Sequence, residues 1–171
     1  MKNRIYFIND ASSMTARLKK MSGKYFYIKL HSQLPGKIEE DEAKLLNLEK
    51  DKEQVIRIVE LGKKSQALII ARSILPFYLF EGDTADCFNA LGEAPLGEIL
   101  FQDPNLKRSP FEISKIDTRD HAWIRDFSLK EKKLWARRSI FYFKGKALLV
   151  FEVFLSAIKG ACNEAERSYR N

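Results

Sequence analysis

The sequence predicts an α+β fold built on an antiparallel β-sheet, and two observations support this class. Two pairs of apolar segments are each joined by a short turn, at residues 62–65 and 144–146, as in β-hairpins. Helical segments lie between the hairpins, but strands and helices do not alternate regularly as a parallel βαβ sheet requires. We therefore expect an antiparallel sheet with inserted helices, in a single domain over residues 1–171.

In the first half of the chain, helix and strand signals follow one another closely. Either Ser12 or Ser13 can cap a short helix that runs through Lys20. The charged region 34–53 contains Pro35–Gly36, and we expect it to be a loop with one helical turn at residues 41–48. Alternating apolar residues or a high content of β-branched residues predict three strands, at residues 24–30, 55–61 and 66–76.

The second half carries clear helix boundaries and two long strands. Asp83–Thr84 is expected to cap a helix that Gly92 ends, and Pro95 to open a second short helix over residues 96–101. The remaining expected segments are a strand at 110–116, a polar loop at 117–133, strands at 134–143 and 147–155, and a tail at 156–171 that is frayed or forms a loose helix.

Composition limits the classes of partner. The chain has 171 residues, 45% hydrophobic and 31% charged, which suits one globular domain. A formal charge of +7 favours nucleic acid, an anionic membrane surface or a small acidic substrate. The longest stretch without charged or strongly polar residues, 73–80, is too short to span a membrane. Lysines and arginines are spread along the chain, and aromatic residues fall in apolar strand rows, so we expect no nucleic-acid partner.

Cysteine and histidine usage argues against a metal centre. Cys87 and Cys162 are far apart and form no CxxC motif, and His31 and His121 are isolated from each other. We therefore expect no metal ligands. Two widely spaced cysteines fit a reducing cytoplasmic location.

Two charged residues stand in apolar strand rows, where a charge needs an explanation. Because side chains alternate along a strand, Arg72 shares a face with Ile70 and Ile74, and Glu152 shares a face with Val150 and Phe154. Burying an arginine costs several kcal/mol unless an anion or several acceptors satisfy it.

Two interpretations of these charges stay open. In the first, Arg72 and Glu152 pair with each other or with other core groups and have only a structural role. In the second, they line a pocket in which Arg72 receives a substrate carboxylate and Glu152 transfers a proton, since apolar walls suit a general acid or base near neutral pH. Next to this pair, Arg137 and Arg138 point to opposite faces of their strand, so one can reach a pocket while the other reaches solvent.

Four segments in order resemble the chorismate pyruvate-lyase (4-hydroxybenzoate synthase) family. They cover most of residues 13–155. They are Ser13-Met14-Thr15-Ala16-Arg17-Leu18, Ala71-Arg72-Ser73-Ile74-Leu75-Pro76, the stretch LGEAPLGEILF at residues 91–101, and the closing hairpin from Leu134-Trp135-Ala136-Arg137-Arg138-Ser139 to Glu152-Val153-Phe154-Leu155.

The resemblance implies a fold, a site and a reaction. It implies helical flaps over an internal ligand site and ligand contacts at Met14, Arg72, Leu96 and Glu152, with Met14 and Leu96 acting through backbone N–H groups. It also implies that no metal or organic cofactor is needed. By resemblance, a monomer converts chorismate to 4-hydroxybenzoate and pyruvate, and the product feeds ubiquinone synthesis.

Within that resemblance we expect Arg72 to stabilise the anion and the ether oxygen, and Glu152 to transfer the proton. The alternative is a non-catalytic domain of the same fold that senses a small aromatic acid. Such domains normally follow a DNA-binding helix-turn-helix, and only about a dozen residues precede the first motif here, so we favour the enzyme.

Overall fold

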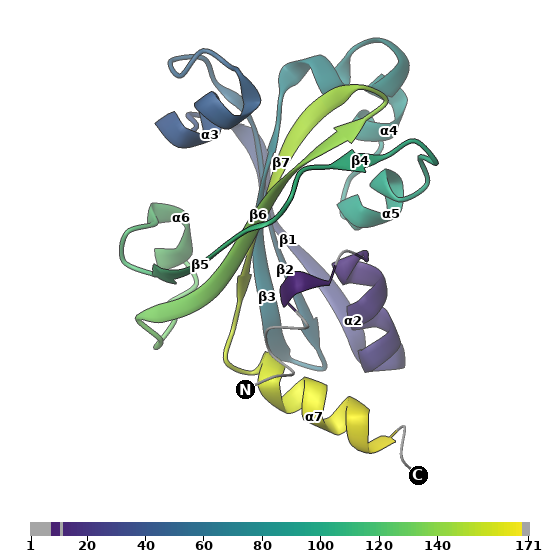
Figure 1. Ribbon diagram of the computed structural model, residues 1–171, viewed down its shortest axis with the longest axis vertical. Coiled ribbons are helices and arrows are strands. Elements are labelled where there is room, and N and C mark those ends of the chain that lie inside the picture. The colour runs from purple at the N-terminus through teal and green to yellow at the C-terminus, as the bar shows by residue number, and fades with distance from the viewer. Residues whose placement is uncertain (1–7, 11, 169–171) are drawn as a thin grey trace.

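The computed structural model describes residues 8–10 and 12–168, with side chains through Asn163. Its centre is a seven-stranded sheet in the order β1-β2-β3-β7-β6-β4, with β5 also paired to β6, and the pairs are antiparallel (Figure 1). The strands are β1 Phe26–Gly36, β2 Gln54–Lys63, β3 Gln66–Leu75, β4 Lys107–Arg108, β5 Glu112–Asp117, β6 Lys133–Phe143 and β7 Lys146–Phe154. The predicted α+β class with an antiparallel sheet is confirmed.

The helices are short and connect or extend the hairpins. They are α2 Met14–Ser22, α3 Glu40–Leu46, α4 Ala85–Asn89, α5 Leu96–Leu100, α6 Ala122–Arg125 and α7 Ile158–Ser168, with 3₁₀ turns at Gly23–Tyr25, Phe77–Phe80 and Gly82–Thr84. Helix α2 begins as predicted, because the Ser13 hydroxyl accepts a hydrogen bond from the Ala16 N–H. Within the described residues, no helix is long and apolar enough to cross a membrane.

Three regions are more ordered than the sequence predicted. Strand β1 continues to Gly36 through a region that we expected to be a loop, and Pro35 is tolerated there because β1 lies at the edge of the sheet. The expected loop at 117–133 contains α6, whose Trp123 and Ile124 are buried. The tail forms α7, which buries Ile158 against the core next to α2. In these regions the secondary structure is stabilised by contacts with residues distant in sequence, which local sequence signals do not show.

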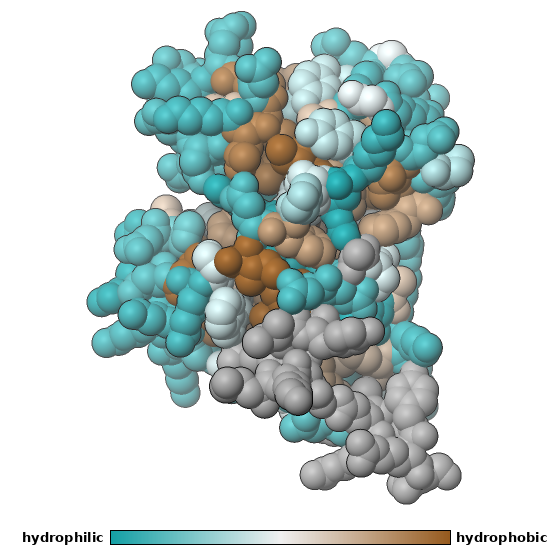
Figure 2. Space-filling view, in the orientation of Figure 1, coloured by the Kyte–Doolittle hydropathy of each residue, from teal (hydrophilic) through white to brown (hydrophobic). Residues whose placement is uncertain are grey.

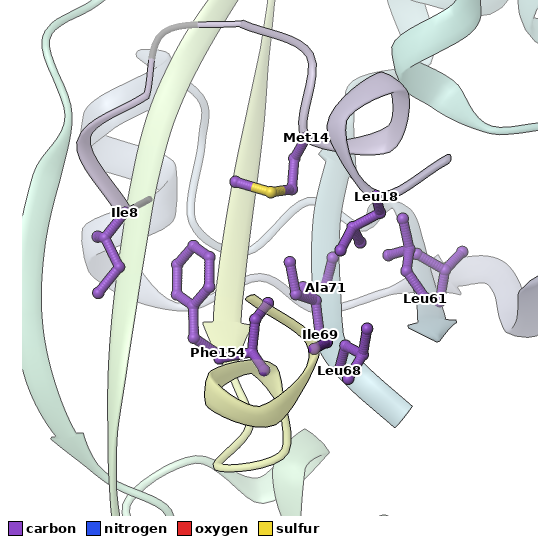
Figure 3. Close-up of a cluster of buried hydrophobic side chains, with 11 residues drawn as sticks. Ile8, Met14, Leu18, Leu61, Leu68, Ile69, Ala71 and Phe154 are labelled. Carbon is purple, nitrogen blue, oxygen red and sulfur yellow. The ribbon is translucent and has the colours of Figure 1, made fainter. Parts of the chain in front are cut away.

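The helices divide between the two faces of the sheet (Figure 1). One face, called here the pocket face, carries α2, α4, α5 and α7, and the opposite face carries α3 and α6. On the pocket face, Met14 and Leu18 of α2 pack over Ala71 and Phe154 of the sheet (Figure 3). On the opposite face, Ile74 packs with α3 and Ile70 packs with α6.

A hollow lies on each face of the sheet. The hollow on the opposite face encloses about 1020 Å³ between α3 and α6 and is visible in the space-filling view as an indented flank with apolar residues inside it (Figure 2). Acidic residues line it, and its arginine, Arg138, already pairs with Asp41 and Glu112. It therefore offers no unpaired cation for an anionic ligand. The hollow on the pocket face differs in this respect.

Candidate functional site

The candidate site is the pocket between the sheet and the first residues of α2 and α5. It encloses about 620 Å³, part of which opens to solvent. Its apolar walls come from both the sheet and the helices. Four charged side chains line it, namely Arg57, Arg108, Arg137 and Glu152.

Glu152 and Arg137 form an ion pair that fixes one side of the pocket. They are direct cross-strand partners on β7 and β6, and Arg137 Nε donates to Glu152 Oε2 at 2.5 Å. The second end of the guanidinium is also occupied, since Nη1 donates to the carbonyl oxygens of Ile8 and Asp10 at 2.8 and 2.9 Å. Arg137 thus orients the carboxylate and holds the segment before α2 against the sheet. The prediction that Arg137 and Arg138 point to opposite faces, one of them into a pocket, holds for Arg137, but Arg138 lines the hollow on the other face and does not simply reach solvent.

Arg57 is the most deeply buried charge in the pocket. Its side chain is only 1% exposed and donates to the Gln33 side chain and to the carbonyl oxygens of Gly92 and Ala94, at 2.7 and 2.8 Å for the two carbonyls. Its Nε is buried without a hydrogen-bond partner, and no carboxylate of the described residues pairs with it.

Burial has an electrostatic consequence for this arginine. It lowers the pKa of Arg57 to about 10, so the side chain remains a cation at neutral pH. A buried cation without a counter-anion is costly, and an anionic ligand beside it would remove that cost. Arg57 is therefore the strongest indication that the pocket takes an anion.

Arg72 is not in this pocket, which corrects the sequence prediction. In the pairing of β3 with β7, Glu152 stands opposite Ala71 and not Arg72, so the side chains of Arg72 and Glu152 point to opposite faces. Arg72 forms a buried two-point ion pair with Glu42 of α3, Nε to Oε1 at 2.8 Å and Nη2 to Oε2 at 2.9 Å. The prediction that Arg72 and Glu152 share a ligand pocket is wrong, and the structural interpretation holds for Arg72.

Met14 and Leu96 do lie in the pocket, as the resemblance implied. Each is the first residue of its helix, where the backbone N–H has no intrahelical acceptor. The two helix starts approach closely, because a Cβ on Gly97 would lie 3.2 Å from Ser13 Oγ and 3.3 Å from Thr15 Oγ1. Glycine at this position permits the close approach of the two helix starts that line the pocket.

Arg57 is not among the predicted site residues, although its strand carries the same signal as that of Arg72. Arg57 shares a strand face with Val55, Val59 and Leu61, which is an apolar row like the one around Arg72. Arg108 gave no such signal, because β4 has only two residues and no periodic pattern. Within the described ranges, no three metal-ligating side chains lie together, so we assign no metal centre.

The pocket lining has an excess of positive charge. Three arginines face one carboxylate, so the lining carries two more positive than negative groups. Such an excess suits a small dianion better than a neutral ligand or a single carboxylate. The fold and the pocket together define an α+β protein that can hold a small organic anion between a sheet and converging helix starts.

The comparisons with known proteins agree with this class. A family model described as chorismate lyase matches residues 5–160, and the chain belongs to the chorismate lyase family. The probable chorismate pyruvate-lyase of Azoarcus sp. (strain BH72) is 34% identical over 160 residues, which cover 90% of this chain and 84% of the relative. That of Methylococcus capsulatus (strain ATCC 33009 / NCIMB 11132 / Bath) is 34% identical over 155 residues, covering 89% and 94%.

Solved structures show the same fold at low identity. The PhnF C-terminal domain has a TM-score of 0.60 and 12% identity, over 75% of this chain and 82% of that chain. A GntR-family transcriptional regulator from Bacillus cereus has a TM-score of 0.57 and 14% identity, over 78% and 93%. These similarities concern the fold alone.

Proposed function

We propose that this chain is a chorismate lyase that converts chorismate to 4-hydroxybenzoate and pyruvate in the pocket described above. The observation that carries the proposal is Arg57, a buried cation without a counter-anion, in a pocket whose excess positive charge suits a dianion. Chorismate is a small dicarboxylate, and the family membership makes it the substrate to test first.

Arg57 takes the anion-binding role that the sequence analysis gave to Arg72. In this proposal Arg57 receives the ring carboxylate together with the N–H groups of Met14 and Leu96, and the presence of all three residues in the pocket lining supports the assignment. Hydrogen bonds from Arg57 to Gly92 and Ala94 also tie the cation to the connection that precedes α5. Ligand binding and the position of the α5 start are therefore coupled through one side chain.

Glu152 is the proton-transfer group. The reaction removes a proton from the ring carbon that bears the hydroxyl, breaks the ether bond and releases enolpyruvate, which becomes pyruvate on gaining a proton. Arg137 Nε donates a hydrogen bond to Glu152 Oε2 and so orients this carboxylate, which can act as the base that accepts the ring proton. The protonated carboxyl group can then supply the leaving group with its proton, so Glu152 regains its charge.

The pathway rests on the family resemblance, and the cytoplasmic setting rests on the cysteine usage. We propose that 4-hydroxybenzoate made here enters ubiquinone synthesis in the cytoplasm, and that the active unit is a monomer.

The test is direct. Protein stripped of bound product is mixed with chorismate, 4-hydroxybenzoate is separated and quantified by its absorbance, and pyruvate is measured with a coupled dehydrogenase. The proposal is supported if the wild type forms equal amounts of 4-hydroxybenzoate and pyruvate and if Glu152→Gln forms neither. Absence of turnover would refute it, and thermal stabilisation by 4-hydroxybenzoate without turnover would favour a ligand-sensing domain.

A further inference from the structure

We propose that Arg108 forms a second anion subsite in the pocket, which receives the side-chain carboxylate of a dicarboxylate ligand while Arg57 receives the ring carboxylate. This inference rests on the proposed function, because it assigns the two ends of that substrate. It also makes a claim about ligand class, since a ligand with a single carboxylate has no group for this subsite.

Arg108 has hydrogen-bonding capacity that the protein does not use. Its guanidinium lies over the rings of Phe111 and Phe141, with its central carbon 4.1 and 5.5 Å from the ring centroids. No hydrogen bond or ion pair joins it to another described side chain or carbonyl, although it is half-buried and lines the pocket. Stacking fixes the plane of the guanidinium and leaves its N–H donors free for a planar anion.

Arg137 provides the internal comparison. It stacks on the same Phe111 ring, also at 4.1 Å, but its donors are taken by Glu152 and by the Ile8 and Asp10 carbonyls. Of the two arginines that stack on Phe111, Arg137 thus uses its donors within the protein, whereas the donors of Arg108 can bind a ligand.

The electrostatics of Arg108 also favour a bound anion. Burial and then the positive charge of Arg137 lower the pKa of Arg108, and the negative charges of Glu152 and Asp10 offset only part of this. A carboxylate beside Arg108 would compensate both unfavourable contributions. Its binding should therefore be stronger than that of a carboxylate at an exposed arginine.

The position of Arg108 in the sheet separates it from Arg57. Arg108 pairs with Phe141 on the outer strand β4, whereas Arg57 lies on β2, and β3, β7 and β6 stand between them. Four strand spacings correspond to roughly 19 Å between the two backbones. Because Arg57 and Arg108 line the pocket from strands that are far apart in the sheet, a ligand that engages both needs two anionic groups.

The first experiment uses the reaction. In Arg108→Gln we expect the KM for chorismate to rise about tenfold or more, because one charge-assisted hydrogen-bonding contact is lost. The Kd of 4-hydroxybenzoate, which lacks the second carboxylate, should stay within about twofold of the wild-type value. Lys107→Gln is the matched control, since Lys107 is the exposed neighbour on the same short strand, and it should change neither quantity.

The second experiment is independent of turnover. The Kd values of 3-(carboxymethoxy)benzoate and 3-methoxybenzoate, which differ by the second carboxylate, are compared by calorimetry. The wild type should prefer the dicarboxylate about tenfold or more, and Arg108→Gln should lose this preference. Equal binding by the wild type, or a preserved preference in Arg108→Gln, would overturn the subsite. A preference that depends on Arg108 in a protein without lyase activity would refute the proposed function and leave the subsite standing.

Discussion

Arg72 and Glu152 lie on adjacent strands, one residue out of register, and their side chains leave the sheet on opposite faces. Each charge is paired on its own face, Arg72 with Glu42 of α3 and Glu152 with Arg137 of β6. The sheet thus separates a structural ion pair from a pocket in which two further arginines, Arg57 and Arg108, have no carboxylate partner among the described residues. This separation determines which arginine variants should affect the ligand and which should affect stability.

Replacing Arg57 should weaken ligand binding far more than it weakens the fold. In Arg57→Gln we expect the Kd of 4-hydroxybenzoate to rise about 100-fold, because the proposed charge-assisted contact to the ring carboxylate is lost. The midpoint of urea unfolding should change little, since the loss of hydrogen bonds to Gly92 and Ala94 is offset by the removal of a buried charge without a counter-anion. Calorimetry and urea titration check the two parts. Arg138→Gln, on the opposite face, is the control, and unchanged binding in Arg57→Gln would contradict the assignment.

Replacing Arg72 should lower stability but leave ligand binding unchanged. Arg72→Met leaves the buried Glu42 carboxylate unpaired, so the free energy of unfolding should fall by about 3–5 kcal/mol. The double variant Arg72→Met with Glu42→Leu should recover most of that loss. Urea unfolding measures stability, and active-site titration of the folded fraction should give a Kd for 4-hydroxybenzoate within about twofold of the wild type. If the well-folded double variant lost 4-hydroxybenzoate binding, Arg72 would have a role in the ligand site after all.

Glu152→Gln should separate catalysis from binding. The amide keeps the shape and an acceptor for Arg137 but accepts no proton, so kcat should fall about 100-fold or more. The Kd of 4-hydroxybenzoate should change by less than about tenfold, because ring-carboxylate contacts lie elsewhere in the pocket. Single-turnover measurements with chorismate check the rate. A kcat that stays near the wild-type value would exclude Glu152 as the proton-transfer group.

Gly97→Ala should loosen the approach of the two helix starts. The added Cβ would meet Ser13 Oγ and Thr15 Oγ1 at 3.2 and 3.3 Å, so these hydroxyl groups must give way by a few tenths of an ångström. Because the Ser13 hydroxyl caps α2, its displacement should disturb the helix start that carries the Met14 N–H, and the KM for chorismate should rise roughly threefold to tenfold with a smaller change in kcat. Gly160→Ala in α7, which has open space around it, is the control and should leave KM unchanged.

Asp10 should contribute stability that disappears in acid. Burial raises the pKa of this carboxyl group, but hydrogen bonds from Ser12 and the positive charges of Arg17 and Arg137 outweigh burial, and the net pKa is lowered. The folded state therefore holds the ionised form more strongly than the unfolded chain. Its contribution is present above the ordinary pKa of 3.8 and is lost as pH falls through the lowered value.

Urea unfolding of Asp10→Asn and the wild type at two pH values checks this. At pH 6 the variant should be less stable by at most about 1 kcal/mol, since the side chain is partly exposed. Near pH 2 the difference should shrink. A difference that grows in acid would contradict the sign of the shift.

Most of the secondary structure could be predicted from local patterns. The two hairpins, the Ser13 cap and the short helix after Pro95 have strong local signals, and the structure contains them near the predicted positions. Helix α6 lacked such a signal because its four residues sit in a charged stretch and are held by burial of Trp123. The extension of β1 depends on pairing with β2, a partner distant in sequence.

The sequence by itself determined that Arg72 and Glu152 stand in apolar rows, because alternation along one strand is a local property. It also carried the motifs that lead to the family. Only the tertiary structure decided which face each row occupies, since that depends on the register between β3 and β7, and a shift of one residue would exchange the faces. In the observed register Arg72 pairs with Glu42, and Glu152 pairs with Arg137. Arg57 is the buried cation whose Nε has no hydrogen-bond partner, which is the physical reason to expect an anionic ligand beside it.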